Sequence, residues 1–267
     1  MSLFEMIVLG VVAGGAAGLL AGLVGIGGGV VIVPTLYYGL TATGLTANDA
    51  THVAVATSLA SIVPSSLVSF VRHLRAGHAD LRFLTEWGPG IIIGVAAAQI
   101  AAPYIDGRVL VAIFALLCLF FSYRFAFPAR FSTARDISMG WSFRCWASVS
   151  IGVSSGLAGV GGGILTNIVM TLSGFSMHKS IGRAAAAGVA VSIPAMIVAT
   201  LFVPSSGATR IGSVDLAILV CIAPAQAVAA WLGASIAVHT SGDILSRVFA
   251  IVLAVTGVVM MRAALWP

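Results

Sequence analysis

Eight residues near the start of the chain, Gly22-Leu23-Val24-Gly25-Ile26-Gly27-Gly28-Gly29, interrupt an apolar run with five glycines. The same pattern returns as Gly156-Leu157-Ala158-Gly159-Val160-Gly161-Gly162-Gly163, with the glycines and the leucine in the same places. The copies lie 134 residues apart (156 minus 22) in a chain of 267. A glycine-rich break used twice, half a chain apart, predicts a protein built from one unit in two copies.

The composition indicates a chain that lies in a membrane. Hydrophobic residues make up 60% of it, charged residues only 8%, and the mean hydropathy is +1.11. A soluble domain carries roughly a quarter charged residues, so this chain cannot cover a water-facing surface. Its long apolar runs predict an all-α membrane protein: a polytopic helical bundle of about 8–10 transmembrane segments built from two inverted repeats, each with a Gly-rich broken helix.

Ten apolar segments make up this bundle. In the first half they cover 4–24, 30–40, 53–71, 83–103 and 109–125. In the second half they cover 141–158, 164–175, 184–203, 214–238 and 244–261. A spanning helix needs about 20 residues, and the segment after each glycine cluster has only about a dozen. We therefore expect a broken or re-entrant element at each cluster, and the sequence leaves both forms open.

Further matches support a duplication. Gly77-His78-Ala79-Asp80-Leu81 resembles Gly212-Ser213-Val214-Asp215-Leu216, and Pro89 matches Pro224 at the same spacing of 135 residues. We divide the chain into a first repeat at 1–125, a cytoplasmic linker at 126–140 and a second repeat at 141–267, within one integral-membrane domain. A weaker alignment, which needs a shorter loop in the second half, places 52–58 opposite 178–184.

The basic residues set the expected orientation of the halves, because lysine and arginine collect in cytoplasmic loops. If each half crosses five times, the second half is inverted, and ten of the thirteen basic residues fall on one side, all except Arg108, Arg210 and Arg262. If the short segments re-enter, each half crosses four times, the repeats are parallel and the tally is nine to four. That one charge favours the inverted arrangement, with both termini outside, which is the usual plan of secondary transporters.

The glycines themselves are the first candidates for a binding site. Glycine permits left-handed backbone, and irregular backbone persists in a bilayer only where protein or a water-filled cavity satisfies its polar groups. A helix that restarts after such a break directs free N–H groups and a positive dipole end at the gap, which suits an anion. The alternative is close helix packing through small residues. The candidates are Gly25, Gly27, Gly28, Gly29, Gly159, Gly161, Gly162 and Gly163.

Five polar side chains could complete such a site. Thr57 and Ser58 are hydroxyl donors in the first half, and Thr166 and Asn167 follow the second glycine cluster directly. The fifth is Arg183, which the weaker alignment places opposite Thr57. An ionisable residue inside a membrane is a functional candidate by default, and a cation that reaches to the interface is the alternative.

Two histidines are candidates for proton coupling. His52 and His178 lie near the starts of corresponding segments, and imidazole titrates near neutral pH. Their alternative role is that of loop or capping residues.

Other chemistries find little support in the sequence. Cys118, Cys145 and Cys221 lie scattered in apolar runs without paired spacing, and no paired acids suggest a metal site. We therefore expect no metal and no cofactor. Nucleic-acid binding would need a basic face with interleaved aromatic residues, which the sequence lacks. Ser154-Ser155-Gly156 lacks the first glycine of a serine-hydrolase motif, where Val153 stands, so we do not expect an enzyme.

The twin Gly-x-x-Gly-x-Gly-Gly-Gly motifs, the Ala56-Thr57-Ser58 element and the Gly77-x-x-Asp80 loop resemble those of the TauE/SafE family of sulfite and organosulfonate exporters. The resemblance covers nearly the whole chain. It implies a bacterial inner-membrane permease that usually exports small sulfur-containing anions and is driven by an ion gradient. It also implies a substrate cradle made of the glycine clusters with Thr57 and Ser58. The second half departs from this pattern with Arg183-Ala184, which suggests one cationic contact for the anion.

The sequence thus predicts a secondary transporter that exports sulfonate- or sulfite-type anions across the inner membrane by alternating access. Its expected partners are the small anionic substrate, the lipid bilayer and a coupling ion such as a proton, with no nucleic acid. Two alternatives stay open: a passive channel for anions or small solutes, and a carrier of another sulfur compound or a carboxylate.

Overall fold

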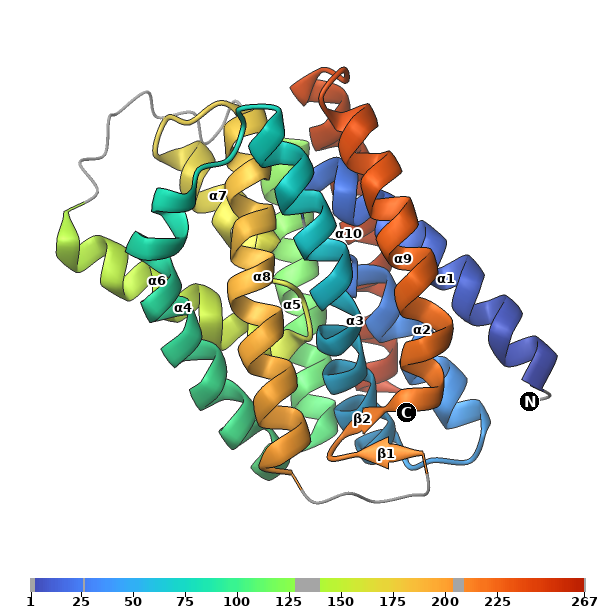
Figure 1. Ribbon diagram of the computed structural model, residues 1–267. Helices are drawn as coiled ribbons and strands as arrows, with labels where there is room; N and C mark the ends of the chain where they lie inside the picture. Colours follow the sequence, from blue (N-terminus) through green and yellow to red (C-terminus); the bar gives the residue numbers. More distant parts are fainter. Residues whose placement is uncertain (1–2, 26, 128–139, 204–208, 267) are drawn as a thin grey trace.

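The computed structural model describes residues 3–25, 27–127, 140–203 and 209–266, which form a bundle of helices with one short β-hairpin (Figure 1). The first half contains α1 (Leu3–Val24), α2 (Gly29–Ala42), α3 (Ala47–Arg75), α4 (Leu81–Ala101), the 3-10 turn η1 (Ala102–Tyr104) and α5 (Gly107–Ala126). The second half contains α6 (Trp141–Ala158), α7 (Gly163–Leu172), α8 (Met177–Leu201), the antiparallel strands β1 (Arg210–Ile211) and β2 (Val214–Asp215), α9 (Leu216–Ala237) and α10 (Gly242–Leu265). Most of the predicted linker 126–140 lies outside the described residues.

Each predicted apolar segment corresponds to one of these helices, so the all-α membrane bundle is confirmed. Polar N-caps extend several helices beyond their apolar runs. The Thr46 side chain accepts a hydrogen bond from the Asp49 amide, so α3 begins at Ala47 and not at the first apolar residue of its run. In the part of the chain that the structure describes, six helices are long and apolar enough to cross a membrane: α3, α4, α5, α8, α9 and α10.

The most extensive helix contacts of one half are matched by contacts between the corresponding helices of the other half. Helix α1 lies on α9 and its counterpart α6 lies on α4, while α2 lies on α3 and α7 lies on α8. The pairs α3–α8 and α5–α10 join counterparts directly. Helices α3 and α8 run antiparallel at the centre of Figure 1. Ser66 contacts Ser192, whereas His78, later in the first half, contacts Gly182, earlier in α8. This arrangement supports the inverted repeat, which stays a prediction.

The pairs α1–α2 and α6–α7 each begin and end at the same end of the bundle. Gly10 of α1 lies against Cys221 near the start of α9, and Leu45, just beyond α2, lines a cavity together with both. In the second half, Arg144 at the start of α6 pairs with Glu86 of α4, and Met170 near the end of α7 contacts Arg183 of α8. Each glycine break is therefore the tip of a re-entrant helical hairpin. The six candidate spans are α3, α4 and α5 in the first half and α8, α9 and α10 in the second, and the number of crossings stays a prediction.

The bundle has two chemically different ends. We call one the basic end: it holds the α3–α4 turn and the starts of α6, α8 and α10. We call the other the hairpin end: it holds β1–β2, the α2–α3 turn and η1. The described cations at the basic end are Arg72, Arg75, Arg82, Arg124, Arg144, Lys179, Arg183 and Arg247, against Arg108, Arg210 and Arg262 at the hairpin end. This sorting supports the prediction that the basic end faces the cytoplasm.

Two glycine seams attach the outer helices to the bundle. A methyl group on Gly14 or Gly18 of α1 would overlap the backbone of α9, and one on Gly94 of α4 would lie 3.1 Å from the Cα atom of Gly152 in α6. Small residues let helix backbones approach closely in membranes. These seam glycines therefore serve close helix packing, which was the alternative role considered for the glycine clusters.

Candidate functional site

The two glycine breaks meet in the core between α3 and α8. A methyl group on Gly27 would lie 2.8 Å from the Ile62 side chain of α3 and 3.2 Å from the Cα atom of Gly161. One on Gly29 would overlap the Gly159 carbonyl oxygen. All the candidate glycines are buried. The structure thus brings the two predicted clusters into direct backbone contact.

The backbone at each break is left-handed where the next helix begins. Gly28 is the N-cap of α2 with a φ of 83°, and Gly162 is the N-cap of α7 with a φ of 72°. These angles explain why glycine is needed there. Among the described residues, no side chain caps either helix. The first N–H groups of α2 and α7 therefore remain open to an outside acceptor, as in helix-terminal anion sites.

Thr57 and Ser58 are fully buried but do different things. The Ser58 hydroxyl donates to the Gly159 carbonyl oxygen at 3.0 Å, so it touches the second break as a site residue should. The Thr57 hydroxyl oxygen accepts from the Asp215 amide at 3.0 Å. Thr57 therefore ties α3 to the β-hairpin, and Ser58 ties it to the glycines.

Two glutamines contact the glycine motifs, although neither is among the candidates from the sequence. Gln226 of α9 donates to the Gly27 carbonyl at 2.8 Å and to the Ser65 hydroxyl at 3.1 Å. Gln99 of α4 donates to the Gly156 carbonyl at 2.8 Å. Each break is therefore held by an amide from the other half of the chain. The signal for both is a lone amide side chain in an apolar run.

The second break is followed by polar groups that lack partners. Thr166 and Asn167 are 0% exposed, and neither the Thr166 hydroxyl nor either amide atom of Asn167 has a hydrogen-bond partner within the described ranges. The Oε1 atom of Gln226, beside the first break, is in the same condition. A buried polar group without a partner costs about 1–3 kcal/mol. Such groups mark a place where a water or a ligand belongs.

The structure corrects the weaker alignment of the halves. Helices α3 and α8 begin at Ala47 and Met177, and their prolines Pro64 and Pro194 follow at the same distance, since 64 minus 47 equals 194 minus 177. On this register Thr57-Ser58 corresponds to Ala187-Gly188 and not to Arg183-Ala184, and His52 does not correspond to His178. The error is four residues, about one helical turn, so the apolar pattern fits both registers.

Arg183 lies toward the basic end and already has a counter-ion. Its guanidinium is 3.1 Å from the Asp80 carboxylate and lies over the Phe175 ring at 3.9 Å. The next residue, Ala184, touches Gly25: a methyl group on that glycine would lie 3.2 Å from its Cβ atom. Arg183 is thus one residue from the first break, and its role as a contact for the anion stays a prediction.

The two predicted coupling histidines lie at opposite ends of the bundle. His178 is at the basic end, where its Nε2 atom is 3.1 Å from the Thr240 carbonyl oxygen. His52 lines a polar cavity of about 210 Å³ at the hairpin end, together with Asp49, Gln99 and Arg210. They therefore cannot act as one pair.

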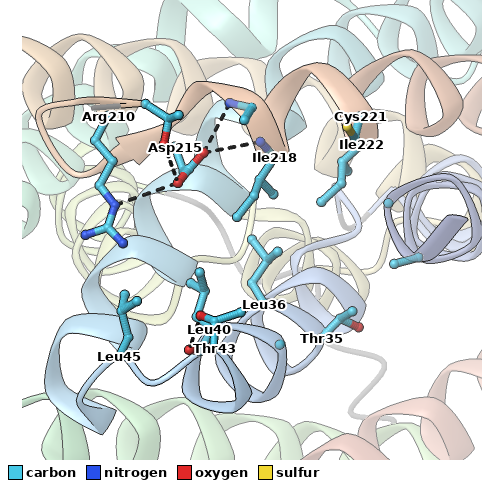
Figure 2. Close-up of a pocket in the computed structure, with 15 residues that line it drawn as sticks. Thr35, Leu36, Leu40, Thr43, Leu45, Arg210, Asp215, Ile218, Cys221 and Ile222 are labelled. Carbon is cyan, nitrogen blue, oxygen red and sulfur yellow. Dashed lines mark hydrogen bonds and ion pairs between the residues drawn. The ribbon is translucent and has the colours of Figure 1, made fainter. Parts of the chain in front are cut away.

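A second cavity at the hairpin end, of about 400 Å³, lies between α1, α2 and the start of α9 (Figure 2). Arg210 lines both cavities, and its Nε atom is 3.7 Å from the Asp215 carboxylate, as Figure 2 shows. The sequence marks Arg210 only as one of the few cations on its side. No group of histidine, cysteine and acidic side chains that could hold a metal ion occurs in the described part of the chain.

Comparisons with known proteins find a matching family and relatives named as membrane transporters. The family described as "Sulfite exporter TauE/SafE" matches residues 10–260. A protein of Haemophilus influenzae named "Probable membrane transporter protein" is 28% identical over 261 residues, which are 97% of this chain and 99% of that protein. "Probable membrane transporter protein YunE" of Bacillus subtilis is 34% identical over 104 residues, 38% of this chain and 37% of that protein. No solved structure matches the chain.

Proposed function

Because the chain belongs to the TauE/SafE family of sulfite exporters, and is therefore a multi-pass membrane transporter and not an enzyme, we propose that it carries a small sulfur-containing oxyanion of the sulfonate or sulfite type. The proposed direction is export across the bacterial inner membrane, and the proposed mechanism is alternating access. The observation that carries the proposal is the contact between two helix-capping glycine breaks in the core.

The donors at this contact suit an oxyanion. A sulfonate or sulfite group offers several acceptor oxygens, so its site must be rich in N–H and O–H groups. The open N-termini of α2 and α7 supply backbone N–H groups, and Thr166 and Asn167 supply a hydroxyl and an amide without other partners. The carboxylates of Asp80 and Asp215 cap the N-termini of α4 and α9, and Asp49 lines the polar cavity at the hairpin end.

The cavities support a path from the hairpin end. The polar cavity reaches Val55 and Ala56 of α3, the residues that precede Thr57 and Ser58. Val55 also contacts the second break, because a methyl group on Gly159 would lie 3.1 Å from its Cα atom. In the proposed cycle this cavity is the outer vestibule, and a movement around the breaks connects the central site to one end at a time.

The substrate class and the mechanism can be tested in proteoliposomes. We expect purified protein to catalyse saturable counterflow of labelled sulfite, and unlabelled sulfite, thiosulfate, taurine or sulfoacetate to compete better than carboxylates of matched size. Protein-free liposomes are the control. Conductance without saturation or counterflow would indicate a passive channel, and better competition by carboxylates would reject the sulfur-anion proposal.

A further inference from the structure

Three histidines form a chain at the basic end. They are His73 of α3, His78 of the α3–α4 turn and His178 of α8. The His178 and His78 ring centroids are 5.3 Å apart, and the His78 and His73 centroids are 6.3 Å apart. We call these residues the histidine chain. Only His178 is a candidate in the sequence. His73 and His78 lie more than ninety residues away from it along the chain and come beside it only in the folded protein.

The histidine chain leads from the surface to the first glycine break. His178 and His78 are half-buried, whereas His73 is only 1% exposed. The Nε2 atom of His73 is 3.3 Å from the carbonyl oxygen of Gly22, at the C-terminal end of α1. That glycine opens the motif that continues into Gly25 and the α2 N-terminus. A proton on His73 would therefore sit where a helix C-terminus favours a positive charge.

Two ring nitrogens lack hydrogen-bond partners among the residues described, as a proton path requires. The Nδ1 atoms of His73 and His78 are buried and have no hydrogen-bond partner in the ranges described. An imidazole can take a proton on one nitrogen while it releases one from the other. Such a step moves only a proton, so it needs no electron donor or further reactant. A water between neighbouring rings would bridge them where the nitrogens do not touch.

The surroundings of His78 keep its ring uncharged at neutral pH. Burial, and then the neighbouring His178, lower the pKa of His78, so this ring is uncharged at pH 7 and can accept a proton. The charged groups nearby are Arg72 on α3, Lys179 next to His178, and the Asp80–Arg183 ion pair. Two backbone carbonyl groups also face the histidine chain. The Gly22 carbonyl of α1 contacts His73, and the Thr240 carbonyl of the α9–α10 turn contacts His178.

We propose that the histidine chain carries the coupling proton between the basic-end surface and the first glycine break. The inference rests on the proposed transport function and names its coupling ion and route. Protonation of His73 strengthens its hydrogen bond to the Gly22 carbonyl and so links proton binding to the position of the break. His52, at the other end of the bundle, is not part of this route.

The test separates exchange from net transport. Counterflow of labelled sulfite needs no net proton movement, whereas accumulation driven by a pH gradient does. We expect His73→Gln and His78→Gln to retain counterflow and to lose gradient-driven accumulation. His239→Gln, an exposed histidine at the same end, is the control and should retain both. Gradient-driven accumulation in His73→Gln and His78→Gln equal to that of the unchanged protein would overturn the proposal.

A second measurement does not depend on the substrate. NMR titration of ring-labelled histidine in purified protein should show the His78 titration moving to higher pH in His178→Gln, because the interaction with His178 that lowers the pKa of His78 is removed. The same titration should be unmoved in His239→Gln. A His78 titration unaffected by His178→Gln would refute the chain even if transport of sulfite is never observed. Absence of counterflow in the unchanged protein, with the expected titrations, would instead count against the proposed substrate.

Discussion

The two glycine breaks begin their short helices in the same way but differ in their side chains. Each begins its short helix with a left-handed glycine, Gly28 or Gly162. In α2 the positions that follow are the buried apolar residues Ile32 and Val33. In α7 the corresponding positions, three and four residues after the helix start, are Thr166 and Asn167. In the proposed site the backbone donors therefore repeat, and the side-chain donors lie in the second half.

In the proposed function, this difference assigns the orientation of the ligand to the second half. Backbone N–H groups bind any oxyanion, whereas a hydroxyl and an amide on one side fix how the ligand lies. A sulfonate has one end with oxygens and one without, so an asymmetric site suits it better than a symmetric one. We therefore expect changes to the shared backbone to remove transport, and changes to the side chains to alter affinity.

The largest expected effect comes from filling the shared backbone. Gly28→Leu and Gly162→Leu should each abolish sulfite counterflow in protein that still inserts into the membrane. At Gly28 even the first carbon would lie 2.7 Å from the Ala17 carbonyl oxygen, and at Gly162 it would lie 2.8 Å from the Val191 side chain. Size-exclusion profiles verify insertion and folding. Normal counterflow in both variants would remove the breaks from the site.

The next effect should distinguish the polar break from the apolar one. Asn167→Val removes two unpartnered polar atoms, so the thermal stability should hold or rise, while affinity for sulfite falls about tenfold if about 1.4 kcal/mol of binding is lost. The reverse change, Val33→Asn, buries a polar group in an apolar setting and should cost about 1–3 kcal/mol of stability. Thermal unfolding with and without sulfite measures both. An Asn167→Val protein that binds as before would show that the asymmetry has no role in recognition.

A finer comparison tests what each N-cap glycine contacts. Gly28→Ala and Gly162→Ala share the cost of a left-handed residue with a side chain, about 1–2 kcal/mol. Gly28→Ala should cost more, because its methyl group meets the fixed Ala17 backbone, whereas the methyl group at Gly162 meets the movable end of the Val191 side chain. Unfolding temperatures of the two variants give the order. The opposite order would mean that the α1–α2 hairpin is looser than its contacts indicate.

The smallest effect concerns the cations near the start of α8. We expect Arg183→Ala to weaken sulfite binding more than Lys179→Ala, because Arg183 is next to the residue that touches Gly25. The change should be below about tenfold, since Asp80 already neutralises the guanidinium and partly exposed ion pairs contribute little. Calorimetric titration with sulfite compares the two. Equal affinities would exclude Arg183 from the site.

Much of the fold could be predicted from the sequence, because hydropathy and N-cap residues are local signals. The ten apolar segments are read directly from hydropathy, whereas Asp80 and Asp215 were matched as a repeat and their role as N-caps came from the structure. The path of α1 and α2 could not be read in this way. The same apolar residues suit a helix that crosses the membrane and a helix after which the chain returns to the side it came from. The offset between α3 and α8 was missed because a shift of one turn preserves the apolar face.

The site was predictable only in its backbone. The repeated glycines identify both breaks, and the contact between them is a tertiary fact that a duplication only suggests. Ser58 was predicted and does touch the second break, whereas Thr57 holds the hairpin. Gln226 and Arg210 lie far from the motifs in sequence, and their roles depend on helices that meet only in the folded chain.

The glycine seams decide which parts of this protein can exist alone. Each seam fastens a helix of one half to a helix of the other, α1 to α9 and α6 to α4. The boundary between the repeats in sequence is therefore not a boundary in space. A half produced as a separate chain would present bare backbone grooves where the exchanged helix belongs. Each half is therefore completed only by the helix that the other half supplies.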